Sequence, residues 1–249
     1  MVYAALIFWL LVLVLTAWGV HELWGRMLKP RTVNSILLPG TLVAQLGHVL
    51  GLLITGATVT NTTLYKDDES GEPEMTRDPK PRIPVLGPVI IGMLPLLACA
   101  VAIYLVTRFL GGSIVAGIDG RTVPDVLPST LAGFWQLLRD QITLAEAVLA
   151  STIQADWQRW DVWVFVYLVI CLTVRMAPFP GTLRGTLGAA VVLGLAGGLV
   201  VSLAQSGRES YQAAWAVLSL AVAALFLLLL ASLLVRGTVS LVKVLASSR

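Results

Sequence analysis

The stretch LPGTLVAQLGH, residues 38–48, decides the fold that the sequence predicts. It lies in an apolar segment, residues 36–59, that contains no Asp, Glu, Lys or Arg. An uncharged apolar segment of this length predicts a transmembrane helix, because crossing the hydrocarbon core takes about 20 residues. The helix breakers within it favour a broken or re-entrant helix that other protein segments cover: Pro39, Gly40, Gly47, Gly51 and Gly56.

The composition of the whole chain predicts an integral membrane protein. Of the 249 residues, 57% are hydrophobic and 12% are charged, and the mean hydropathy is +0.86, whereas soluble domains contain about a quarter charged residues. The first apolar segment is interpreted as a retained helix, since it lacks the basic start and the small-residue cleavage site of a signal peptide. Cys99 and Cys171 lie inside apolar segments, where a thiol behaves as a small hydrophobe. Six apolar segments are expected, at 2–20, 36–59, 83–107, 157–177, 185–207 and 210–235.

We therefore predict a single all-α transmembrane domain over residues 1–249, with five or six transmembrane helices, a small β-hairpin and an interfacial amphipathic helix. The expected location is a bacterial inner membrane, with a multi-pass topology. The net charge of +3 comes from scattered basic residues, which excludes the clustered basic surface of a nucleic-acid-binding protein.

The distribution of Lys and Arg bears on orientation. Arg26, Lys29 and Arg31 directly after the first segment favour a cytoplasmic end there, which puts Met1 outside. With six spans the Lys and Arg residues divide into 8 inside and 9 outside, which decides nothing. With five spans they divide into 12 and 5, but the charges do not say whether the second or the fourth segment fails to cross. The fourth segment is too short to cross the membrane unless Trp157, Trp160 and Trp163 anchor one of its ends at the headgroups and Arg175 snorkels to the surface at its other end.

Two elements are expected outside the spans. Residues 58–78 begin with alternating β-branched residues and contain a Ser70-Gly71 turn signal, which predicts the β-hairpin. Residues 129–153 place apolar side chains at helical spacing, with Ser129 as the expected N-cap. This amphipathic helix is expected to lie along the membrane interface, to dock on a partner or to pack against the bundle of its own chain.

His48 belongs to an incomplete zinc motif. The motif His-Glu-x-x-His binds zinc through two histidines on one helical face and uses its glutamate as a general base. Here Ala44 stands at the first histidine position, so only one zinc ligand of the motif remains. Gln45 stands at the glutamate position, where an amide replaces the carboxylate. His21 and Glu22 also begin like the motif, but Gly25 occupies its fifth position. No catalytic residue is therefore predicted.

Three blocks of the chain resemble site-2-protease-like membrane zinc metallopeptidases. Residues 38–59 are similar to the helix that carries the zinc motif, together with the Pro-Gly that precedes it. Residues 85–97 are similar to the helix that follows in those proteins. Residues 163–188 are similar to a helix and a proline-containing turn that carry an acidic zinc ligand. Thr182 stands where such relatives would place an aspartate. The resemblance implies a membrane scaffold whose zinc motif is lost at Ala44, Gln45 and Thr182, with His48 retained, so no cofactor is expected.

Three functions are open at this point. The first is a catalytically inactive structural or regulatory subunit of a membrane complex, whose partners are membrane lipids and other membrane-protein subunits. The second is a small channel or transporter element with a polar site formed by His48, Gln45 and Thr55, since polar groups inside a membrane mark functional paths. The third is an atypical metallopeptidase, which would need His21, His48 and Asp119 to converge on a metal. Asp119-Gly120 reads more simply as a turn.

Overall fold

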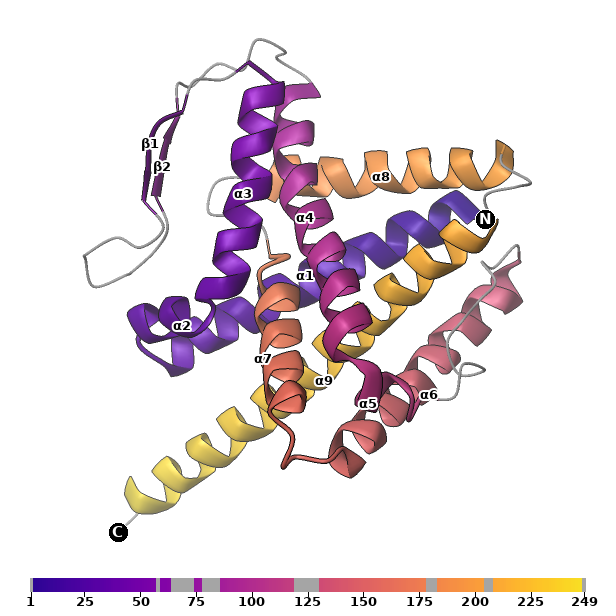
Figure 1. Cartoon of the computed structure of the whole chain (residues 1–249). Coiled ribbons are helices and arrows are strands. Elements are labelled where there is room, and N and C mark those ends of the chain that lie inside the picture. Colours follow the sequence, from indigo (N-terminus) through magenta and orange to yellow (C-terminus); the bar gives the residue numbers. More distant parts are fainter. Residues whose placement is uncertain are drawn as a thin grey trace.

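The computed structural model describes residues 2–56, 59–63, 74–77, 86–118, 130–177, 183–203 and 208–247. Most of this part of the chain is helical, and the long helices cross one another at steep angles (Figure 1). In chain order the elements are α1 (Val2–Met27), α2 (Pro30–Ile36), α3 (Leu38–Ile54), β1 (Val59–Thr63), β2 (Glu74–Arg77), α4 (Leu86–Leu110), α5 (Gly112–Val115), α6 (Leu131–Gln154), α7 (Trp160–Val174), α8 (Leu183–Leu203) and α9 (Arg208–Ser247).

Three helices are long and apolar enough to cross a membrane: α1 over Tyr3–Met27, α4 over Leu86–Leu110 and α9 over Trp215–Leu241. The pair α2 and α3 makes a fourth candidate if the two count as one broken span, because they are bent by 79° at Leu37. These findings are compatible with a multi-pass membrane protein. They also confirm the expectation that the second apolar segment is broken.

The predicted fold class was wrong in its five or six transmembrane helices. The described residues give three, or four with the bent pair. The reason is the length of the apolar helices: α7 has 15 residues and α3 has 17, which fall short of the about 20 residues that span a hydrocarbon core. The apolar stretch of α8, Arg184–Leu199, is also shorter than a span. An apolar composition is shared by helices that are buried in a bundle and helices that face lipid.

The strands β1 and β2 pair only with each other and lie apart from the helices (Figure 1). The ladder is antiparallel, with Val59 opposite Arg77 and Thr63 opposite Glu74, and its register shifts between Val59 and Asn61. The Ser70-Gly71 turn signal lies outside the described residues.

The main core forms where α1 packs between α8 and α9. Trp9 and Trp215 are each 1% exposed, and their ring centroids lie 6.3 Å apart. Val14, Val20 and Leu225 are fully buried around them. Burying two tryptophans and branched aliphatic side chains provides a large apolar contribution to stability.

Helix α6 covers almost the predicted range but packs through a partly different face. Its N-cap is Thr130, whose hydroxyl accepts a hydrogen bond from the Gly133 amide at 3.1 Å, and Ser129 lies outside the described residues. Gln141 donates to the Ser219 carbonyl of α9 at 2.9 Å. The predicted apolar face is divided: Trp135 and Ile142 are 61% and 59% exposed, whereas Phe134 and Leu138 are partly buried against the main core. The helix therefore packs on its own bundle and also presents an apolar face to its surroundings.

Candidate functional site

The incomplete zinc motif lies on α3, in the interior of the bundle. Pro39 stands in the first turn of α3, where its missing N–H costs no hydrogen bond. The helix ends at Thr55, and the chain then turns at Gly56, whose φ of 69° favours glycine. Between these ends Ala44 is fully buried, and Gln45 and His48 are 3% and 6% exposed. The three motif positions are thus enclosed by protein.

Glycines bring α3 into direct backbone contact with α4. A methyl group added at Gly47 would lie 2.6 Å from the Leu94 carbonyl oxygen and 2.8 Å from the Pro95 Cα. A methyl group at Gly51 would lie 3.0 Å from the Ile91 Cα. Because Gly47 meets residues 94 and 95 while Gly51 meets residue 91, the two helices run antiparallel. Small residues allow helix backbones in a membrane to approach this closely, and His48, the residue after Gly47, is itself buried.

The predicted polar site is only partly assembled. Thr55 is buried, but its hydroxyl lies 2.8 Å from the Gly51 carbonyl and 3.1 Å from the Leu52 carbonyl, so it bonds its own helix. Within the part of the chain that the structure describes, Gln45 Oε1 has no hydrogen-bond partner. A polar path through His48, Gln45 and Thr55 stays a prediction.

A second polar cluster, which the sequence analysis missed, holds the break between α2 and α3. The carbonyl of Ile36, the last residue of α2, accepts hydrogen bonds from the Tyr167 hydroxyl at 2.7 Å and from the Cys171 thiol at 3.3 Å. Both donors lie on α7 and are four residues apart, which places them on one helical face. We call Tyr167, Cys171 and Arg175 the α7 clamp, since Arg175 continues the same face.

Arg175 is the buried end of this clamp. Its side chain is 7% exposed, and Nη2 donates to the Asn34 Oδ1 of α2 at 2.6 Å. Its positive charge also acts on His21 of α1 and Cys99 of α4. Arg175 is therefore held inside the bundle, because the break between α2 and α3 places an amide acceptor within its reach. The snorkelling that the short fourth segment would need in order to cross a membrane is not observed.

A methyl group on Gly40 would clash with the Cys171 carbonyl and lie 3.0 Å from the Arg175 Cγ. Helix α3 is thus fixed on both sides, by α4 through Gly47 and by the α7 clamp near Gly40. The sequence carried a signal for the clamp, namely polar residues at spacing four on an apolar helix. It carried no signal for the partner they bind.

His21 lies on α1 and His48 on α3, whereas Asp119 and Thr182 fall outside the described residues. Among the residues with described positions, no three His, Cys, Asp or Glu side chains gather as metal ligands would.

Comparison with known proteins gives no relative: no family model, no curated protein and no solved structure matches the chain.

Proposed function

We propose that the chain is a catalytically inactive, site-2-protease-like membrane protein that serves as a structural or regulatory subunit of a membrane complex, in a bacterial inner membrane. The proposal starts from the residues of α3. Gln45 is an amide and has no basicity to activate water, and Ala44 offers no ligand atom. Helix α3 thus carries the motif positions but lacks the general base and one of the two histidine ligands.

The close contact between α3 and α4 carries the proposal. A zinc hydrolase keeps one coordination position open for water and substrate. At the motif of this chain, the glycine faces of α3 bring backbone atoms together instead, and Ala44 is fully buried. Packing of this kind favours a rigid scaffold over a site that admits a substrate.

The C-terminal half of α9 offers a surface for a partner helix. It extends beyond the other helices (Figure 1), and Leu233, Leu234 and Leu241 are 49%, 70% and 62% exposed. Gly237 and Thr238 help to line an open apolar groove of about 400 Å³ on this helix. Small residues beside exposed leucines let a second helix approach closely.

The proposal is tested by the size and composition of the native particle in mild detergent. We expect a stoichiometric partner subunit, lost in Gly237→Leu, which fills the groove. Gly25→Leu is the matched control, because among the described residues a methyl group at either glycine meets no atom within 4 Å. A strictly monomeric wild-type particle would contradict the subunit role.

Metal content tests the inactive state independently. We expect elemental mass spectrometry to find well under one zinc per chain in protein purified without chelator or nickel. About one zinc per chain, lost in His48→Ala, would overturn the proposal and favour an atypical metallopeptidase.

A further inference from the structure

Helices α1 and α9 run in the same direction through the protein. Near the start of each, Trp9 packs against Trp215 with ring centroids 6.3 Å apart. Near the end of α1, Trp24 Nε1 donates to the Ser232 hydroxyl at 2.7 Å. Residue numbers rise together along both helices, so they are parallel, and Figure 1 shows them side by side with the N-terminus near the start of α9. Since both are candidate spans, their C-terminal ends lie on the same side of a membrane.

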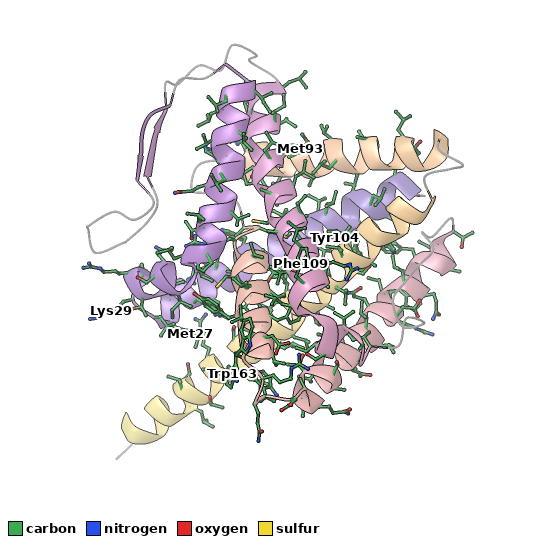
Figure 2. The ribbon with its side chains drawn as sticks, in the orientation of Figure 1. Met27, Lys29, Met93, Tyr104, Phe109 and Trp163 are labelled. Atoms are coloured by element: carbon green, nitrogen blue, oxygen red, sulfur yellow. The ribbon has the colours of Figure 1, made fainter. Side chains whose placement is uncertain are left out.

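This arrangement brings basic residues from two distant parts of the sequence to one end of the bundle. Arg26 ends α1, Lys29 and Arg31 follow it, and Arg236 lies one helical turn beyond Ser232 on α9; all four are exposed. We call these four residues the basic rim. Figure 2 shows Lys29 directed away from the helices at the corner between α1 and α2. Glu22 pairs with Arg26 at 3.0 Å, so the rim with Glu22 has a net charge of about three positive units at neutral pH.

Exposed apolar side chains accompany the basic rim. Leu28, Ile36 and Leu38 are 48%, 43% and 43% exposed in the same region. Exposed apolar side chains beside cationic ones are typical of a surface that lies in the interface, with the apolar groups in the acyl region and the charges at the phosphates. This mixture fits a lipid surface better than a free anion.

We infer that the basic rim is a binding surface for anionic phospholipid headgroups on the cytoplasmic side of the membrane. Basic residues concentrate on that side, and its leaflet is negatively charged, so each Lys or Arg near it contributes to attraction. The parallel course of α1 and α9 puts both C-terminal ends on one side of the membrane. The basic residues then assign that side to the cytoplasm and the start of α1 to the outside. The inference does not depend on the proposed subunit role.

Lipid retention tests the binding surface. The probe is protein reconstituted in vesicles of equal phosphatidylglycerol and phosphatidylcholine, then extracted in mild detergent for mass spectrometry of the retained lipids. We expect phosphatidylglycerol to be retained severalfold over phosphatidylcholine, with the preference falling stepwise as basic residues are removed and weakening in 1 M NaCl.

The variant R26Q/K29Q/R31Q/R236Q is expected to retain both lipids equally, and K29Q/R236Q to show an intermediate preference. Arg139→Gln, an exposed change on α6, is the control and is expected to keep the wild-type preference. Equal retention by the wild type, or an unchanged preference in the fourfold variant, would overturn the inference.

Cysteine labelling tests the side of the membrane. Cys99 and Cys171 are both fully buried, so background labelling is low. A membrane-impermeant maleimide is expected to label Tyr3→Cys in intact cells, and to label Thr32→Cys and Thr238→Cys only in inverted vesicles. Labelling of Thr32→Cys and Thr238→Cys on opposite sides would refute the parallel arrangement, and labelling of both from outside would refute the cytoplasmic assignment.

Discussion

Replacing Gly47 with alanine is expected to destabilise the protein relative to the same replacement at Gly19. A methyl group at Gly47 would lie 2.6 Å from the Leu94 carbonyl oxygen, 2.8 Å from the Pro95 Cα and 2.9 Å from the Ala98 Cβ. Two of these are backbone atoms, so α3 and α4 must move apart. A methyl group at Gly19, in the middle of α1, meets no described atom within 4 Å.

The pair of variants separates the steric effect from helix propensity. Alanine favours a helix over glycine by about 1 kcal/mol, and this gain is the same at both positions. The remaining difference is the cost of overpacking, about 1–3 kcal/mol. In a chain of this size 1 kcal/mol changes Tm by roughly 2–4 °C, so Gly47→Ala should melt roughly 2–12 °C below Gly19→Ala.

Thermal unfolding in one mild detergent, followed by tryptophan fluorescence, measures this difference. Trp9 and Trp215 are both buried in the main core, so their emission reports loss of the packed bundle. If Gly47→Ala melts at or above the temperature of Gly19→Ala, the backbone contact between α3 and α4 is refuted. The tight packing of the motif helix, on which the proposed function rests, would then be refuted with it.

Three further changes probe the clamp and the cap of α6. Tyr167→Phe removes a hydrogen bond to the Ile36 carbonyl and should lower the free energy of unfolding by about 1 kcal/mol. Amide hydrogen exchange in α2 should become faster, and unchanged exchange would show that this hydrogen bond does not stabilise α2. Asn34→Leu removes an acceptor from a buried guanidinium and should cost about 1.5–3 kcal/mol in the same unfolding assay; wild-type stability would contradict the contact with Arg175. Thr130→Ala removes the N-cap of α6 and should cost about 1 kcal/mol; a loss of helical circular dichroism without a change in Tm would show that α6 frays independently of the bundle.

The sequence predicted the long spans well because their signal is local. Composition alone marks the apolar segments that become α1, α4 and α9. The break near Pro39 was also predictable, since Pro and Gly act on the backbone where they stand. The span count failed because a buried helix and a lipid-facing helix have the same composition, and only the helix ends observed around α3 and α7 distinguish them.

The sequence predicted the motif positions of the candidate site but not the contacts that surround them. Ala44 and Gln45 can be read directly from the sequence, and so can the spacing of Tyr167, Cys171 and Arg175. The contact between Arg175 and Asn34 joins residues 141 positions apart, and no periodicity encodes such a pairing. An arginine near the end of an apolar helix is therefore expected at the membrane surface unless the fold provides a buried acceptor.

The two contacts of α3 together explain why the exposed surfaces matter most for function. Polar groups buried in a membrane bundle are costly unless they are hydrogen-bonded, and the α7 clamp meets this requirement at the Ile36 carbonyl and at Asn34. The glycine contact with α4 holds the motif helix directly against a neighbouring backbone. An interior fixed from both sides has little freedom to rearrange, because packed cores deform poorly. On the two proposals made above, recognition therefore falls to groups at the surface, namely the groove on α9 for a partner helix and the basic rim for anionic lipid.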